Sequence, residues 1–569
     1  MGQEVKAKFL STVGVCLVAA AAVVCSAAAH DDDKDHEHRH PHDIHTATPI
    51  KHLVVIFNEN RSFDHYFATY PNAANPSGSI AFVAKPHTPK VNNLANAGLL
   101  TNNPNLNPAN GTGATNPFRL DRTQANTKSQ NHAYTPEQQA VDNGKEDLFP
   151  KFTGRGTAGG VGAFGTNGQV MGYFDGNTVT AFWNYAQHFA MSDNNWTDTF
   201  GPSTPGAIEV VSGQTNGAQN IVGTSSSIAD GQGGLTLIGD TDPAYDSCSS
   251  TTSQVLMTSK NIGDLLNAEQ ISWGSFMGGF DLTLKNGNGT TNCGRSTFSS
   301  NVNGTIVDYI PHHAWFQYYK STANPTHARP SSLNAIGHTY VPGSKTVDPA
   351  NHAYDLEDFY ASVKAGNFPA VSYIKMPAYQ DGHPGNSDPL DEQAGNVELV
   401  NFLQKQKEWG ETAVIITYDD SDGWYDHQYL APISASYDPT ADQVNGPGQC
   451  GRGVSKQKQP KGLEGKPVNG RCGPGTRTPF LVISPFAKRN YVSHNFISQA
   501  SVVRFIEDNW LHGQRLGGGS FDDSVESIAD MFDFERGHGH DHEYRQDTLF
   551  LDPTAGTVIV SPPDDHHHH

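Results

Sequence analysis

Short, unbroken runs of apolar residues recur along the chain and predict buried β-strands. The clearest runs cover residues 53–57, 271–276, 370–374, 413–418 and 480–483. Runs without polar alternation are typical of parallel strands that are covered on both faces. Apolar residues at helical spacing cover residues 207–211, 262–269, 355–364, 397–408 and 495–511. The mixture of these two patterns predicts an α/β fold with a central, mostly parallel sheet flanked by helices.

Two long polar stretches interrupt this pattern, near residues 76–130 and 221–260. Both are rich in Asn, Gly, Thr and Ser. A chain of 569 residues can fold as one large domain with insertions or as two to three ordinary domains. We expect one catalytic domain over residues 48–515, with the two polar stretches as loop insertions. Residues 516–569 would then form a C-terminal extension and tail, and the histidines at 566–569 are either natural or a purification tag.

The first 29 residues have the pattern of a signal peptide. Lys6 and Lys8 precede an apolar run over residues 9–24, and three alanines at 27–29 suit cleavage. The run is short for a bilayer span, so we expect an exported protein without an integral membrane segment. No twin-arginine pair is present, which favours the general secretion route into the periplasm or out of the cell.

Residues 30–47 are dominated by His and Asp and offer no hydrophobic face, which predicts a disordered arm. The arm is either a solvated leader or a transient binder of divalent metal ions. The whole chain has 37 Lys+Arg and 58 Asp+Glu, a net charge of −21. This balance argues against unassisted binding to nucleic acid or to an anionic membrane, because both need a basic surface.

Cleavage after residue 29 would leave four cysteines: Cys248, Cys293, Cys450 and Cys472. In an oxidising compartment these predict two disulfides, for which three connectivities are possible. We favour the sequential pairing, in which Cys248 bonds to Cys293 and Cys450 bonds to Cys472. Each of these pairs brackets a loop that is rich in small and polar residues.

Polar side chains directly follow two of the predicted strands, where ligands bind in an open α/β sheet. Glu59 and Asn60 come after the first strand, and Asp419 and Asp420 come after the strand at 413–418. Adjacent carboxylates repel each other, and a bound divalent cation stabilises their ionised forms. Oxygen ligands suit Mg²⁺, Ca²⁺ or Mn²⁺. The alternative is a pair of polar turns with Asp as a helix cap, but two such clusters favour a metal site.

Candidate reactive groups occur elsewhere. Ser203 lies between two prolines at the start of a predicted helix, where backbone N–H groups can bind an anion. Four histidines have unusual neighbours: His132, His312, His313 and His383. The chain contains 27 histidines, so any single one is more often structural than catalytic.

These segments together resemble the bacterial phosphoesterase family that contains phosphocholine-type phospholipases C and related acid phosphatases. The resemblance covers about residues 50–511 and is carried by residues 59–67, 201–205, 418–427 and 476–485. The acid phosphatase branch is the more similar one, on residues 131–139, 312–313 and 381–393. The family is similar in fold to alkaline phosphatases, which implies a sandwich of that type with long loop insertions.

Carried over position by position, the resemblance implies one divalent metal ion bound by Glu59, Asn60, Asp419 and Asp420. It implies that Ser203 is the nucleophile and also contacts the metal. It implies phosphate-contacting and proton-transfer roles for the four histidines named above. In many relatives a smaller residue stands at the position of Asp422.

The sequence therefore predicts an exported, metal-dependent phosphoric-ester hydrolase. The first choice is an acid phosphatase that acts on small phosphomonoesters through a phosphoserine intermediate, with an optimum below neutral pH. One alternative is a phospholipase C that releases phosphocholine from phosphatidylcholine. Another is a non-catalytic periplasmic protein that binds metal ions. The sequence indicates neither the identity of the metal nor the oligomeric state.

Overall fold

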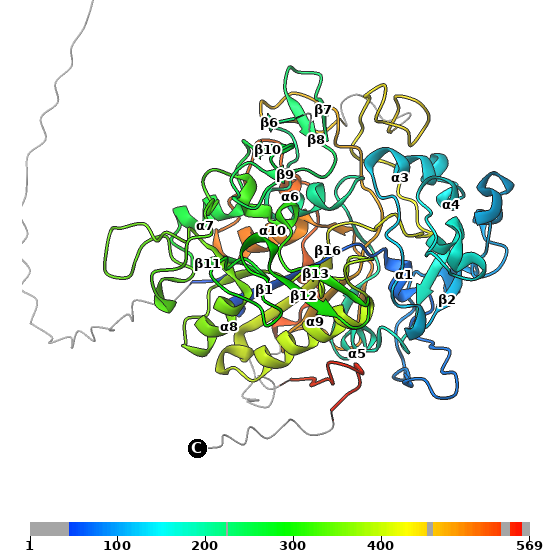
Figure 1. Cartoon of the computed structure of the whole chain (residues 1–569), viewed down its shortest axis with the longest axis horizontal. Helices are drawn as coiled ribbons and strands as arrows, with labels where there is room; N and C mark the ends of the chain where they lie inside the picture. The colour runs from blue at the N-terminus through cyan, green and yellow to red at the C-terminus, as the bar shows by residue number, and fades with distance from the viewer. Residues whose placement is uncertain (1–44, 224–225, 452–458, 536–546, 560–569) are drawn as a thin grey trace, which may run out of the picture. The chain divides into compact units, whose positions relative to one another are not determined.

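The computed structural model describes residues 45–223, 226–451, 459–535 and 547–559. The predicted signal peptide, most of the arm at 30–47 and the C-terminal histidines lie outside the described residues. A central eight-stranded sheet crosses the molecule (Figure 1). Its strands, in spatial order, are β14 (Ala353–Asp355), β11 (Trp273–Met277), β15 (Val371–Lys375), β1 (His52–Asn58), β16 (Thr412–Tyr418), β17 (Phe480–Ile483), β4 (Ala190–Ser192) and β18 (Tyr491–Ser493).

The sheet is mostly parallel, as predicted. Strands β14, β11, β15, β1 and β16 form parallel pairs, and β18 is parallel to β4. Strand β17 is antiparallel to both of its neighbours, so the expectation of a parallel strand at 480–483 is wrong. Its four side chains are all buried. A continuous apolar run reports burial on both faces, and that burial does not depend on the direction of the strand.

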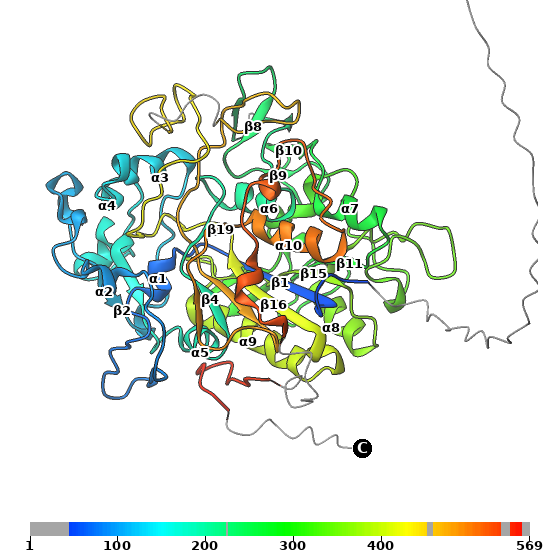
Figure 2. The same ribbon diagram turned by 180° about the vertical axis from the view of Figure 1, so that it is seen from behind.

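Helices cover both faces of the sheet (Figures 1 and 2). One layer contains α6 (Ser203–Ser212), α7 (Ile262–Ala268) and α10 (Ala500–Trp510). The other contains α5 (Thr180–His188), α8 (Leu356–Lys364) and α9 (Pro389–Gln404). Every residue of α6 is buried, so this helix lies inside the protein and not on its surface. The predicted α/β architecture is confirmed.

Several helix boundaries differ from the sequence prediction. Helix α9 begins at Pro389, eight residues before the predicted start, because Asp388 caps it and a proline suits its first position. Helix α10 begins at Ala500, not at 495, because Ile497 and Ser498 form a short strand, β19. Helix α6 already begins at Ser203. Local contacts at the ends, which periodicity does not report, set these boundaries.

The remaining elements are short. The helices are α1 (Phe63–Phe67), α2 (Leu94–Ala97), α3 (Tyr134–Val141) and α4 (Phe149–Phe152). The strands are β2 (Phe118–Leu120), β3 (Gly172–Phe174), β5 (Asn195–Trp196), β6 (Ala218–Val222), β7 (Ser227–Ala229), β8 (Leu235–Leu237), β9 (Asp242–Pro243), β10 (Gln254–Met257), β12 (Ser296–Ser299), β13 (Gly304–Val307) and β19 (Ile497–Ser498). Both predicted insertions consist of such short elements and loops. Within the described part of the chain, no helix combines the length and apolarity that a bilayer span requires.

Both disulfides form in the sequential pairing. The Cα atoms are 5.4 Å apart in Cys248–Cys293 and 5.9 Å apart in Cys450–Cys472. The domain limits at 48 and 515 stay predictions. The described residues after 515 nevertheless contribute buried side chains to the main core, among them Leu516, Ile528, Met531, Phe532 and Leu551.

Candidate active site

The two predicted ligand clusters lie side by side, because β1 and β16 are adjacent parallel strands. Their register pairs Asn58 with Tyr418, so the chain leaves both strands at the same edge of the sheet. The backbone N–H of Asn60 donates a hydrogen bond to Asp419 Oδ1 at 2.9 Å. Asn60 has a φ of 64°, a left-handed conformation that asparagine adopts more readily than most residues. The turn after β1 is therefore built to hold Asn60 against the end of β16.

Ser203 joins these clusters from the first position of α6. Its hydroxyl lies 3.0 Å from Glu59 Oε2 and 3.2 Å from Asp420 Oδ2, and it can donate to either carboxylate. The residue is 1% exposed. The neighbouring hydroxyl of Thr204 donates instead to Asp240 Oδ1, at 3.1 Å. Ser203 is thus the hydroxyl that faces the predicted ligands.

Helix α6 approaches the sheet so closely that only glycine fits at one position. A Cβ atom on Gly206 would lie 2.1 Å from the backbone oxygen of Asp419, far inside van der Waals contact. A side chain there would push the helix away from the turn after β16. The missing side chain at 206 therefore sets how near Ser203 comes to the carboxylates.

The oxygen atoms around Ser203 fit a hard divalent cation. Asn60 Oδ1 and Asp419 Oδ2 are buried and have no hydrogen-bond partner in the described structure. Unpartnered buried oxygens are costly, and a cation would satisfy both. Burial and the negative charge of Asp419 raise the pKa of the Asp420 carboxyl well above its usual value. A cation would favour the ionised form, so this donor set suits Mg²⁺, Ca²⁺ or Mn²⁺.

The four predicted histidines gather near this site. The rings of His312 and His313 are 4.4 Å apart, and His383 lies 6.4 Å from His313 and 6.3 Å from His132 between ring centroids. His313 Nδ1 is 3.3 Å from Glu59 Oε1, which links the group to the carboxylates. The four histidines are therefore neighbours, although they come from three segments that are far apart in the sequence.

The environments of the histidines differ in charge. Burial lowers the pKa of His313 well below its usual value and also lowers that of His383. For His132, burial has the same direction, but Asp420 and Asp422 outweigh it and raise the pKa. His132 Nδ1 lies 3.1 Å from Asp422 Oδ1, so Asp422 pairs with an imidazole. The site thus holds imidazoles of two kinds, two that favour the neutral form and at least one that favours the cation.

The pKa of His312 is also raised. Burial alone would lower it, but interactions with Asp242 and Asp240 prevail. His312 Nδ1 lies 3.7 Å from Asp242 Oδ1. His312 therefore joins His132 among the imidazoles that favour the cation.

Sequence reasoning missed two charged residues of the site, Lys375 and Asp381. Lys375 is the last residue of β15, is 2% exposed, and its ammonium contacts Glu59 Oε1. Burial lowers the pKa of Lys375, and the carboxylates of Asp419, Asp381 and Asp420 oppose that shift. The Asp381 backbone oxygen accepts a hydrogen bond from the Glu59 N–H at 2.8 Å. A lysine that ends an apolar strand is the signal in the sequence, because buried lysines are almost always paired.

Other acidic and histidine clusters are compensated by the protein itself. Asp64, Asp426 and His427 lie close together, but Arg477 donates to Asp426 Oδ1 at 2.9 Å and lies 3.6 Å from Asp64 Oδ2. A third group contains Cys248, which is already in a disulfide. These two groups therefore have structural explanations. The 476–485 segment contributes Arg477, which pairs with the carboxylates of Asp426 and Asp64.

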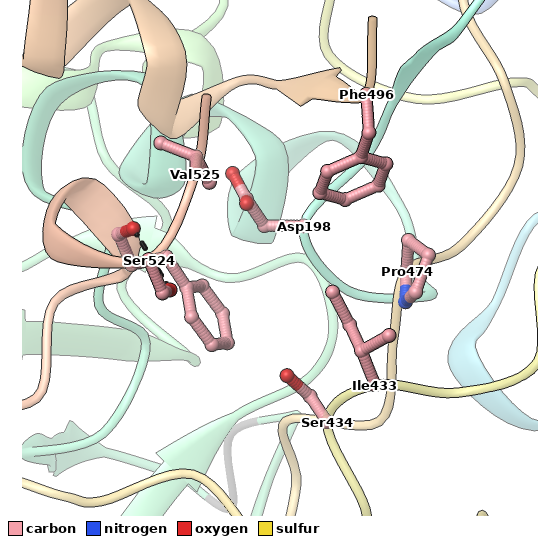
Figure 3. A pocket seen from close by; sticks show the side chains of 8 residues that line it. Asp198, Ile433, Ser434, Pro474, Phe496, Ser524 and Val525 are labelled. Atoms are coloured by element: carbon pink, nitrogen blue, oxygen red, sulfur yellow. Dashed lines mark hydrogen bonds between the residues drawn. The ribbon is translucent and has the colours of Figure 1, made fainter. Parts of the chain in front are cut away.

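One cavity of about 300 Å³ lies near the start of α10 and is separate from this site (Figure 3). Its walls are largely apolar, with Phe496, Ile433 and Pro474 around Asp198. Both Asp198 carboxylate oxygens are occupied, by Ser498 Oγ and by the N–H of Ala500. Burial raises the pKa of Asp198 to about 6. The cavity shares no lining residue with the candidate active site, and Asp198 serves as a local cap.

A match to a family model shows that the protein is a phosphoric-ester hydrolase. Residues 50–511 match the model of the Phosphoesterase family, which is most of the chain. The chain therefore belongs to the phosphoesterase family, as the sequence motifs predicted.

Similar proteins carry phospholipase names. The chain is 24% identical over 472 residues to Phospholipase C A of Mycobacterium tuberculosis. The match covers 81% of this chain and 72% of that protein. It is 29% identical over 174 residues to Non-hemolytic phospholipase C of Pseudomonas aeruginosa, which covers 30% of this chain. That second match spans only 24% of the length of the Pseudomonas protein.

Similarity to solved structures is low. Murine ectonucleotide pyrophosphatase/phosphodiesterase 5 has 12% identity and a TM-score of 0.28, over 62% of this chain and 95% of that one. A Vibrio parahaemolyticus protein titled as a member of the alkaline phosphatase superfamily has 11% identity and a TM-score of 0.25, over 72% and 74%. The description of the fold therefore rests on the strand order and the helix layers given above.

Binding of a divalent cation is expected to stabilise the folded chain. At a concentration of 100 times the dissociation constant, the gain is about 2.7 kcal/mol. Thermal unfolding with excess Mn²⁺ and with a chelator measures it. The increase in melting temperature should be lost in Asp419→Asn and kept in Asp523→Asn, which changes the same charge at an exposed position. Equal melting temperatures with Mn²⁺ and with chelator would contradict a metal site here.

Proposed function

We propose that this chain is an exported, metal-dependent hydrolase that cleaves small phosphomonoesters through a phosphoserine intermediate. The observation that carries the proposal is the position of the Ser203 hydroxyl, buried between the carboxylates of Glu59 and Asp420. A serine hydroxyl at the start of a helix also has backbone N–H groups nearby, which favour a phosphoryl group. The two disulfides support export into an oxidising compartment.

Glu59, Asn60, Asp419 and Asp420 would hold the cation, with Ser203 beside it. When bound, a cation lowers the pKa of a neighbouring hydroxyl and offsets the charge of phosphoryl oxygens. The four histidines would contact the phosphoryl oxygens and move protons. Imidazolium groups would supply part of the positive charge that two-metal phosphatases obtain from a second ion.

The reaction proceeds in two displacements. Ser203 Oγ gives its proton to an adjacent carboxylate and bonds to phosphorus, while the bond from phosphorus to the leaving oxygen breaks. A histidine, His383 or one of the 312–313 pair, protonates the leaving oxygen. Water then attacks the phosphoserine and gives a proton to a histidine. The bond between phosphorus and Ser203 breaks, inorganic phosphate leaves, and the hydroxyl recovers its proton.

Ser203→Ala should abolish phosphate release from an aryl phosphomonoester, with a loss of more than about 10³-fold in kcat. Thr204→Val is the matched control, because the Thr204 hydroxyl bonds to Asp240 and does not face the predicted ligands. It should lose far less activity. Equal losses in the two variants would contradict the assignment of the nucleophile. Comparable phosphate release by Ser203→Ala and wild type would contradict the mechanism.

Hydrolysis should be fastest below neutral pH. The leaving oxygen needs a proton from a histidine, and burial lowers the pKa of His383 below its usual value of about 6.5. Its protonated form is present in acid and is lost as the pH rises through the lowered pKa, so the rate falls on the alkaline side. The profile of kcat/KM from pH 4 to 9, in wild type and His383→Asn, measures this. An optimum above pH 9 that persists in variants of all four histidines would contradict the acidic assignment.

The second candidate is a phospholipase C reaction, in which the same groups cleave a phosphodiester and release phosphocholine. The similarity of the chain to proteins named phospholipase C favours it. A direct comparison decides between the two: phosphate released from an aryl phosphomonoester against phosphocholine released from phosphatidylcholine micelles. We expect a higher kcat/KM for the monoester. A higher value for the micelles would replace the monoester with the phospholipid. Metal binding without turnover of either substrate would favour a binding protein.

A further inference from the structure

We propose that the Lys375 ammonium is a built-in cation that takes the place of a second metal ion in this site. Lys375 is a positioning residue: it holds the Glu59 carboxylate and offsets charge beside the reacting atoms. The inference rests on the proposed function and extends it to a residue that the sequence motifs do not contain.

The first observation is that the two carboxylate oxygens of Glu59 have different partners. Glu59 Oε1 contacts the Lys375 ammonium and lies 3.3 Å from His313 Nδ1. Glu59 Oε2 lies 3.0 Å from the Ser203 hydroxyl. One oxygen is thus held by a fixed cation while the other faces the nucleophile. This arrangement fixes the orientation of the carboxylate, because each oxygen has a different partner.

The second observation is that the same place has the ligands of a metal site. Glu59, His313 and Asp381 each present a ligand atom, and these three atoms lie within 4.8 Å of one another. Asp381 Oδ2 is buried and has no hydrogen-bond partner in the described structure. Lys375 delivers a positive charge into this group from the end of β15. An ammonium therefore occupies a position whose donors would otherwise suit a divalent ion.

The third observation is that the sheet fixes where this charge lies. Strand β15 is parallel to β1, and Ile374 pairs with Ile56, so Lys375 is level with Phe57, two residues before Glu59. Its ammonium lies 5.9 Å from the centre of the Phe57 ring, and the residue is 2% exposed. A buried ammonium cannot turn to solvent, and its charge acts strongly at short range in such surroundings.

Charge balance gives the reason for the arrangement. Glu59, Asp381, Asp419 and Asp420 carry four negative charges when ionised, and one divalent cation would offset two of them. The Lys375 ammonium offsets a third, so a phosphoryl group meets less repulsion. Removal of Lys375 would leave the Glu59, His313 and Asp381 group without a cation, and that group would then take up a second divalent ion.

The test counts metal ions and does not depend on turnover. Wild type, Lys375→Met and Lys375→Arg are equilibrated with Mn²⁺, freed of excess ion, and analysed for manganese per chain. We expect one ion in wild type and in Lys375→Arg, which keeps the charge. We expect two in Lys375→Met. Lys364→Met, at an exposed position on α8, is the matched control and should retain one ion.

Kinetics supply the second measurement. The kcat of Lys375→Met should fall by about 10²- to 10³-fold, the effect of removing one electrostatic contact in an active site. Its KM should change less, and Lys375→Arg should recover part of kcat. A role confined to folding would change neither the number of ions nor the division between kcat and KM.

Several outcomes overturn the inference. Two ions in wild type, a single ion in Lys375→Met, a second ion in Lys375→Arg, or a kcat of Lys375→Met close to that of wild type would each do so. If Lys375→Met does not fold, a second ion in wild type or in Lys375→Arg still overturns the inference. No bound Mn²⁺ in wild type would overturn the metal site of the proposed function as well, whereas two ions would overturn this inference alone.

Discussion

The concentration of negative charge at one edge of the sheet is the constraint on which the rest of this structure depends. The chain leaves β1 and β16 at the same edge of the sheet, and buried carboxylates directly follow each strand. Buried carboxylates are stable only with cations or hydrogen-bond donors beside them. The residues packed around this edge supply those partners: a serine hydroxyl from α6, imidazoles from three loops, and an ammonium from β15.

This requirement explains why segments far apart in the sequence meet here. Arg477, in the segment before β17, donates to Asp426 and to the backbone of Asn92 and Asp193, and so joins three loops behind the site. Glu392 of α9 accepts hydrogen bonds from Tyr66 and Tyr418. These partners are buried, so they fix the loops that carry the reactive groups. Loops held on a rigid sheet are where binding and catalytic residues usually occur.

The sequence predicted those features that depend on residues close together in the chain. Apolar runs located five strands to within two residues, and the polar residues after two of them located the carboxylates. Three strands of the central sheet, β14, β4 and β18, were missed because three residues are too few to establish a pattern. The direction of β17 and the role of Lys375 depend on which strands become neighbours. That information arises only when distant segments pair.

Gly206 has a consequence for how such chains are compared. The proposed nucleophile, the oxygen donors and the imidazoles are the residues by which one would judge whether a related protein is an active enzyme. Here their spacing depends on a residue that has no functional group, since a single methyl group at 206 would collide with the backbone of Asp419. A homologue could retain every reactive side chain and still be a pseudoenzyme, if a larger residue at this position holds the helix away from the sheet.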